Sequence, residues 1–206
     1  MHPLVSVIIP YNRDRSFLKE AIQSVDDQIY HNIELILSES PGSVGYNLNR
    51  GIEKAKGKFI KYLCDDDLLP YDSIENSISA FANGVDFIHG TACNFWPDGK
   101  SDIYTPDYFN PTLEQMLSKN VIHGGTLMYR REVFEKYGMF DETLWTGEEY
   151  EFNLRILAAG ARLGYCEKPP LYFYRRHAAQ KSLGNTSSEY QRKRAIAIQA
   201  IKNKYL

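Results

Sequence analysis

The chain has few of the features that mark secreted, membrane-spanning or disulfide-stabilised proteins. Its 206 residues include three cysteines, at positions 64, 93 and 166, which are odd in number and far apart, so neither a disulfide framework nor a zinc site is expected. No apolar run approaches the roughly 20 residues that span a bilayer, and the N-terminus lacks the basic segment and apolar core of a secretion signal. The sequence therefore predicts a cytoplasmic protein without a transmembrane segment.

A strong excess of one charge is also lacking. Lys and Arg number 24 against 26 Asp and Glu, which gives a net charge of -2. This balance excludes a general affinity for nucleic acid. Residues 175–204 are locally basic, which leaves peripheral association with a membrane open.

Apolar runs and helical periodicities alternate through the first 90 residues. Short runs rich in branched residues, as in buried parallel strands, occur at 5–9, 33–37, 59–63 and 85–89. Helical spacing of apolar residues occurs between them, at 17–28, 46–55 and 73–82. With 43% apolar residues the chain can bury one substantial core. The order predicts an α/β fold in a single domain, with a mostly parallel, Rossmann-like sheet flanked by helices.

The regular alternation changes after residue 90. Turn signals at 97–99 and 106–107 predict a hairpin or an irregular excursion over residues 90–110. The patterns that follow predict strands at 126–129 and 171–174, and helices at 111–119, 131–137, 148–159 and 188–205.

Three consecutive carboxylates, Asp65, Asp66 and Asp67, follow the strand predicted at 59–63. In open α/β sheets, ligands bind at the carboxyl ends of the strands. Neighbouring ionised aspartates repel each other by on the order of 1 kcal/mol per pair in partly solvated surroundings. Hard divalent cations with oxygen ligands relieve that repulsion, so the motif predicts a site for Mn²⁺ or Mg²⁺. The alternative is a solvated acidic turn that caps the next helix.

Six segments occur along the chain in this order: VSVIIPYNR, FLKEAIQSVDDQIYHNIELIL, NRGIEKAKGKFIKYLCDDDLLP, RREVFEKYGMFDE, GEEYEFNLRILAAG and YRRH. Together they resemble glycosyltransferase family 2, whose members have the GT-A fold and use nucleotide-diphosphate sugars. The resemblance implies transfer of the sugar, with inversion at the anomeric carbon, to a hydroxyl of a glycan or other acceptor. It also implies a nucleotide-sugar-binding half at about residues 1–90 and an acceptor-binding, catalytic half at about 91–206.

The resemblance assigns the donor nucleoside to the end of the first strand, at Pro10, Tyr11, Asn12 and Arg13. Glu39 stands where the family has a base-reading aspartate, and its capacity to accept from a base N–H favours uridine. The sequence is equally consistent with Glu39 being a surface carboxylate in a turn. Asn49 matches the asparagine of the family's Ala-Arg-Asn pattern, which is Asn47-Leu48-Asn49 here, so a positive contact to the donor is missing.

The same resemblance implies that Asp65 and Asp66 contact the donor and that Asp65, Asp66 and Asp67 hold the cation together with His177. Which aspartate ligates the metal stays open. Arg175 and Arg176 are expected at the diphosphate, because guanidinium groups match phosphate geometry.

Glu148 and Glu149 match the family's carboxylate pair, and the resemblance makes Glu149 the general base with Glu148 orienting the acceptor. Carboxylates in a first helical turn are also favoured by the helix dipole, whatever their function. The acceptor pocket is expected at His123, Gly124, Gly125 and Trp145, although the tryptophan also fits a core position.

Two other functions stay open. A sugar nucleotidyltransferase would share the sheet and the acidic site, but it usually has an early glycine-rich basic loop that residues 10–15 do not provide. A GT-A-like module that binds nucleotide or glycan without turnover is the other alternative, because the chain departs from the family pattern at residues 38–41 and 47–49.

Overall fold

The computed structural model describes residues 2–12, 17–81, 84–178, 180 and 188–206. Its centre is a six-stranded sheet in the order β2-β1-β3-β7-β4-β8. Its strands are β1 (Val5–Tyr11), β2 (Ile33–Glu39), β3 (Phe59–Tyr62), β4 (Phe87–Gly90), β7 (Met128–Arg130) and β8 (Leu163–Cys166). Only β7 runs against its neighbours, β3 and β4. The predicted α/β fold with a mostly parallel sheet is confirmed.

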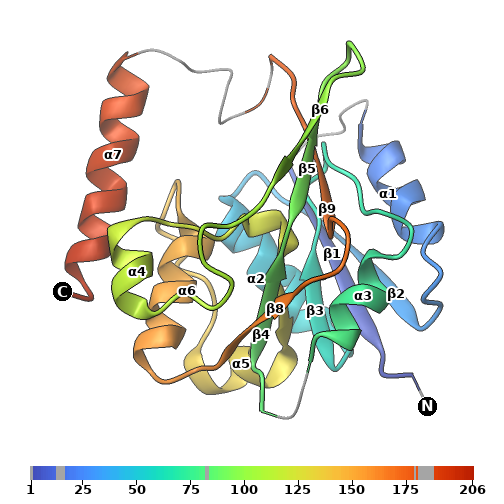
Figure 1. The fold of residues 1–206 in the computed structure, drawn as a ribbon, viewed down its shortest axis with the longest axis horizontal. Helices are drawn as coiled ribbons and strands as arrows, with labels where there is room; N and C mark the ends of the chain where they lie inside the picture. The colour runs from blue at the N-terminus through green and yellow to red at the C-terminus, as the bar shows by residue number, and fades with distance from the viewer. Residues whose placement is uncertain (1, 13–16, 82–83, 179, 181–187) are drawn as a thin grey trace.

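Apolar residues of β1 alternate between two cores, one on each face of the sheet. Ile8 packs in the core formed with α2 (Val44–Lys54), α4 (Leu113–Ser118), α5 (Arg131–Tyr137) and α6 (Glu148–Ala158). Val7 and Ile9 pack in the core formed with α1 (Leu18–Asp26) and α3 (Ser73–Ser79). Burial on both faces explains why this strand reads as a continuous apolar run. Figure 1 shows the two groups of helices on opposite sides of the sheet.

A second sheet of three strands has the order β6-β5-β9. Strands β5 (Ala92–Phe95) and β6 (Ser101–Tyr104) form the hairpin that was one of the two alternatives for residues 90–110. Strand β9 (Tyr172–Arg175) pairs in parallel with β5. In Figure 1 these strands lie in the middle of the molecule, between α1 on one side and the C-terminal helix α7 (Ser188–Asn203) on the other.

Some boundaries differ from the predictions. Strand β8 was not predicted, because its four residues include Gly164 and only two of the four are buried. Residues 124–126 form a 3-10 turn, η1 (Gly124–Thr126), and β7 starts only after it, at Met128. Helix α3 ends at Ser79. Ser16, a candidate N-cap for the helix predicted at 17–28, and Asn83, part of the cap expected after the helix predicted at 73–82, lie outside the described residues. Within the described part of the chain, no helix is long and apolar enough to cross a membrane.

Candidate active site

The three aspartates follow β3 directly and lie at the carboxyl edge of the sheet. The chain turns there, with the Asp67 N–H donating to the Cys64 carbonyl oxygen at 3.2 Å. Strand β9 closes over this turn, because Leu68 and Phe173 exchange backbone hydrogen bonds of 3.0 and 2.9 Å. The aspartates therefore lie between the central sheet and the small sheet.

Asp67 is the most enclosed of the three, with 1% of its surface exposed. Its Oδ2 accepts from the Tyr172 hydroxyl at 2.7 Å, and its Oδ1 accepts from the backbone N–H of Arg175 at 2.8 Å. Burial and the neighbouring Asp66 raise the pKa of Asp67 well above its usual value. Both oxygens already have a donor, so this carboxylate joins β9 to the aspartate turn.

Asp66 contacts the predicted late histidine. The Nε2 of His177 lies 3.1 Å from Asp66 Oδ2, and the His177 ring packs on Phe17 with centroids 5.0 Å apart. Among the described residues, Cys64, Asp66 and Asp67 have ligand atoms that all lie within 4.8 Å of one another. Burial raises the pKa of Cys64 well above its usual value, so its thiol stays protonated and is a poor ligand for a hard cation. The structure thus brings Asp66 and His177 together as the pair best suited to a metal.

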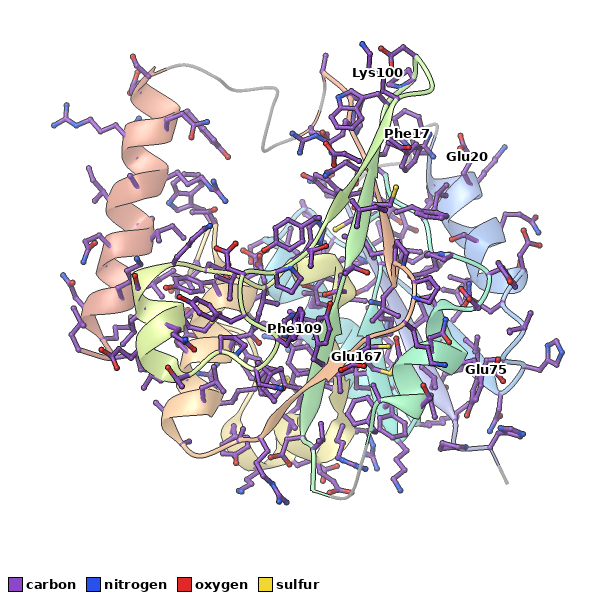
Figure 2. The ribbon with its side chains drawn as sticks, viewed as in Figure 1. Phe17, Glu20, Glu75, Lys100, Phe109 and Glu167 are labelled. Atoms are coloured by element: carbon purple, nitrogen blue, oxygen red, sulfur yellow. The ribbon has the colours of Figure 1, made fainter. Side chains whose placement is uncertain are left out.

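The two arginines at the end of β9 have different surroundings. The Nε of Arg175 donates to the Asp66 carbonyl oxygen at 2.9 Å, and its Nη2 pairs with Glu20 at 2.7 Å. Its guanidinium lies over the ring of Phe17 at 4.3 Å. Figure 2 shows Phe17 and Glu20 at the start of α1, beside the small sheet. Arg176 instead lies over Trp96, with a distance of 5.7 Å from the guanidinium carbon to the ring centroid.

The residues predicted to bind the nucleoside lie where β1 and β2 end side by side. Tyr11 pairs with Glu39 in the sheet register, and its hydroxyl donates to Glu39 Oε2 at 3.2 Å. Glu39 is exposed, as a ligand-reading carboxylate requires. Pro10 is buried in the strand and Asn12 is exposed just after it. The predicted contact at Arg13 lies outside the described residues.

Asn47, which sequence reasoning did not select, ties these strand ends together. Its Nδ2 donates to the carbonyl oxygens of Tyr11 at 3.2 Å and Ser40 at 3.1 Å. Asn49 points elsewhere: its amide exchanges hydrogen bonds with the backbone of Phe140 and donates to Glu142 Oε1 at 2.8 Å. Asn49 is 3% exposed and anchors the loop before α6. Its amide is engaged in these bonds, so it does not extend toward a nucleotide-sugar.

Glu148 and Glu149 begin α6, directly after Gly147, whose φ of +76° suits glycine. Glu149 lies against the 3-10 turn, because a Cβ added to Gly124 would meet Glu149 Oε1 at 3.1 Å and the Tyr62 hydroxyl at 2.9 Å. The structure therefore brings together the predicted base and part of the predicted acceptor turn. Gly125 has a packing role instead, since a Cβ there would lie 2.3 Å from the Tyr172 ring.

Lys61 was missed as a functional residue, although a lysine within an apolar strand run is itself a signal. Its side chain is fully buried, and Nζ donates to the carbonyl oxygens of Gly125 at 2.5 Å and Leu127 at 3.2 Å. Burial lowers the pKa of Lys61 to about 7. The lysine joins the strand that carries the aspartates to the turn beside Glu149.

His123 stands among aromatic rings in front of this turn. Its ring centroid lies 5.6, 5.7 and 5.1 Å from those of Tyr104, Tyr172 and Tyr174. Burial, followed by the charges of Lys61 and Arg176, lowers the pKa of His123 to about 4, so the ring is neutral near pH 7. Its Nδ1 is buried and has no hydrogen-bond partner among the described residues.

Trp145 is 41% exposed and so is not a core residue. Its ring meets the Tyr190 ring of α7 edge-on, with centroids 5.6 Å apart. The same helix covers Gly147, since a Cβ there would lie 2.7 Å from Ile198 Cδ1. Helix α7 therefore packs against the segment that leads to Glu149.

Comparisons with known proteins agree with this architecture. The family described as "Glycosyl transferase family 2" matches residues 38–138. An uncharacterized glycosyltransferase of Rickettsia bellii (strain RML369-C) is 29% identical over 216 residues, which cover 88% of this chain and 31% of that protein. A second, RP339 of Rickettsia prowazekii (strain Madrid E), is 28% identical over 86% of this chain and 65% of its own length. The chain thus spans about a third to two thirds of these curated relatives.

Solved structures share the fold. TarS 1-349 from S. aureus in complex with UDP-GlcNAc superimposes with a TM-score of 0.70 at 16% identity, covering 98% of this chain and 70% of that one. Mannosyltransferase PcManGT from Pyrobaculum calidifontis in complex with GDP-Man and Mn²⁺ gives 0.69 at 16% identity, covering 99% and 65%. The fold is that of GT-A glycosyltransferases. The chain is similar to glycosyltransferase family 2, whose model matches its residues 38–138.

Proposed function

We propose that this chain transfers a sugar from a nucleotide-diphosphate sugar to a hydroxyl of a glycan or other acceptor, with inversion and with the help of a divalent cation. One observation carries the proposal: Tyr62, at the end of the strand that leads to the aspartates, is close enough to Glu149 and Glu148 for their charges to affect it. Its hydroxyl donates to the Gly124 carbonyl oxygen at 2.7 Å, and Glu149 and Glu148 help to raise its pKa, after burial. The aspartate turn begins two residues beyond Tyr62. A donor at the aspartates would thus lie near a base at Glu149.

In this reaction Glu149 takes the proton of the acceptor hydroxyl as that oxygen attacks the anomeric carbon. The bond between that carbon and the diphosphate oxygen breaks, and the electron pair leaves with the diphosphate. A positioned base contributes about 10²–10⁴-fold to the rate. Glu148, beside it, orients the acceptor.

Asp65, Asp66 and His177 are the residues that would hold Mg²⁺ or Mn²⁺. Carboxylate oxygens match the preference of these ions, and the Asp66–His177 distance of 3.1 Å places two ligand atoms at one point. Asp67 is a further candidate, because each of its oxygens accepts one hydrogen bond, from Tyr172 or Arg175, and keeps a second lone pair. A cation bound there would stabilise the charge that develops on the leaving diphosphate.

Uridine is the proposed base of the donor. The exposed Glu39 carboxylate beside Tyr11 could accept the N–H of a uracil ring. TarS binds UDP-GlcNAc and PcManGT binds GDP-Man, so likeness of fold does not select the base. Competition of UDP, GDP and dTDP for one fluorescent nucleotide tests the choice, and stronger competition by GDP or dTDP would reject uridine.

A binding module without turnover stays the second candidate. It is favoured by Leu48, which stands at the arginine position of the family pattern and is buried in the core with 1% exposure. The Leu48 side chain is apolar and packs inward, so it supplies no positive contact to a donor.

Three variants separate the two functions: Glu149→Gln, Asp66→Asn and, as a neighbouring control, Glu148→Gln. Donor affinity is measured by calorimetry with Mn²⁺ and with chelator, and transfer or donor hydrolysis is measured on the same samples. Glu149→Gln should keep donor affinity and lose about 10²-fold or more in rate. Asp66→Asn should weaken donor binding itself. Full rates for Glu149→Gln, or equal donor affinity with and without chelator, would contradict the proposal.

A further inference from the structure

Residues 172–177 present two different faces, because side chains alternate along an extended strand. Phe173, Arg175 and His177 share the side of α1. Their partners there are Phe95, Glu20 and Phe17. The backbone N–H of Arg176 donates to the Phe95 carbonyl oxygen at 2.9 Å, so the pairing with β5 extends to this residue. The two arginines expected together at the diphosphate are therefore directed to opposite sides.

The other face carries Tyr172, Tyr174 and Arg176. The Arg176 guanidinium lies over Tyr174 at 5.3 Å and over Trp96 at 5.7 Å, and the Tyr174 ring meets the His123 ring at 5.1 Å. His123 precedes Gly124, against which Glu149 lies. This face therefore lies on the side of Glu149, the proposed base, whereas Arg175 and His177 contact Asp66.

Two nitrogen atoms on this face lack partners. Arg176 Nε and His123 Nδ1 are both buried and make no hydrogen bond to any described residue, and no ion pair of Arg176 occurs among those residues. The guanidinium is charged at every physiological pH, and a buried donor without an acceptor is costly. Arg175, one residue earlier, has both a carbonyl and a carboxylate partner. Arg175 is therefore fully paired, whereas Arg176 lies near the neutral His123 ring with no acceptor for its Nε among the described residues.

We propose that Arg176 and His123 form a subsite for an anionic group, phosphate or carboxylate, carried by the acceptor. The inference rests on the proposed function and deepens it, because an acceptor held there would present a hydroxyl to Glu149. Arg176 supplies the charge and a planar pair of donors that fit either oxyanion. His123 supplies a neutral nitrogen, which an oxyanion can use as a donor when Nδ1 carries the proton. The class of acceptor is then an acidic or phosphorylated glycan.

Three probes with the same ring test this: glucose 6-phosphate, glucuronic acid and glucose. Their binding is followed by ligand-observed NMR with diamagnetic Mg²⁺ and saturating UDP, so that the diphosphate position is filled. The anionic probes should saturate the protein, whereas glucose should bind at least about tenfold more weakly. Better binding of the phosphate or of the carboxylate identifies which anion the acceptor carries.

The variants are Arg176→Gln and Arg176→Lys, with Arg131→Gln as the control, since Arg131 forms an exposed pair with Glu135 at 3.1 Å. Arg176→Gln should weaken the anionic probes about tenfold or more and leave UDP affinity within about twofold, and Arg131→Gln should change neither. Arg176→Lys keeps the charge and should lose less, which also covers the case in which Arg176→Gln fails to fold.

Three results would overturn the subsite: glucose binding as well as the anionic probes, unchanged probe binding in Arg176→Gln, or a loss of UDP affinity equal to the loss for the probes. The last result would place Arg176 at the donor diphosphate. If none of UDP, GDP and dTDP binds the wild-type protein, the proposed function fails, but the probe titrations without nucleotide still decide the role of Arg176.

Discussion

The hydroxyl of Tyr172 joins the aspartate turn to the last strand, and its removal in Tyr172→Phe tests how strongly. The hydroxyl donates to Asp67 Oδ2 at 2.7 Å and accepts from the Cys64 backbone N–H at 3.1 Å. Tyr172 is fully buried, so water cannot replace either bond. Because burial raises the pKa of Asp67, both bonds are counted as bonds between neutral groups, each contributing about 0.5–1.5 kcal/mol. Tyr172→Phe, which removes both, should therefore lower the free energy of unfolding by roughly 1–3 kcal/mol.

A matched control is Tyr150→Phe. Tyr150 is 1% exposed, and its hydroxyl makes one neutral bond, to the Met116 carbonyl oxygen at 2.6 Å. Its loss should cost about 1 kcal/mol. Urea unfolding of both variants, compared at equal m-values, gives the difference. Metal-dependent UDP affinity should also fall in Tyr172→Phe and stay unchanged in Tyr150→Phe. Equal stability loss in the two variants would refute the idea that Asp67 pins the strand.

Three further predictions concern two buried side chains and a pair of glycines. The pKa of His89 is lowered to about 4 by burial, so between pH 4 and about 6.5 the unfolded state binds more protons and stability falls as the pH is lowered. His89→Gln should remove close to one bound proton from this pH dependence in urea titrations. The pKa of Lys61 is about 7, so its charging costs stability as pH falls from about 10.4 to 7, and Lys61→Met should flatten stability over that range. Gly147→Ala should loosen the packing of α7, because the added Cβ would meet Ile198 Cδ1 at 2.7 Å, and hydrogen exchange at residues 198–205 should become faster. Gly160→Ala is the control: Gly160 has a φ of +84° and nothing within 4 Å of an added Cβ, so this variant should lose only the backbone cost of about 1–2 kcal/mol.

Much of the fold follows from local pattern. A run such as Val7-Ile8-Ile9 can only be a strand buried on both faces, and the structure puts its members in two cores. Strand β8 could not be found in this way. Gly164 interrupts its pattern, yet a Cβ there would meet Val85 Cγ1 at 2.9 Å, so the glycine is required by packing between distant segments. A close approach of this kind leaves no local signal.

The site shows the same limit at the level of single residues. Asn47 and Asn49 are two residues apart on α2, and a helix turns by about 200° over that interval. One amide therefore reaches Tyr11 and Ser40, and the other reaches Phe140. Asp66 and Asp67 are likewise equivalent in sequence. Only the position of Tyr172, more than a hundred residues away, decides which one is enclosed.

The register of β9 against β5 therefore has chemical consequences beyond the sheet itself. Phe95 pairs with Arg175, which fixes Arg175 toward Asp66 and Glu20 and directs Arg176 toward His123. A shift by one residue would exchange the two arginines and detach the backbone N–H that Asp67 accepts. The same shift would move Tyr172 away from Asp67. The proposed donor and acceptor sides are thus positioned by one strand, and the aspartate turn of the first half is complete only when residues from the second half lie beside it.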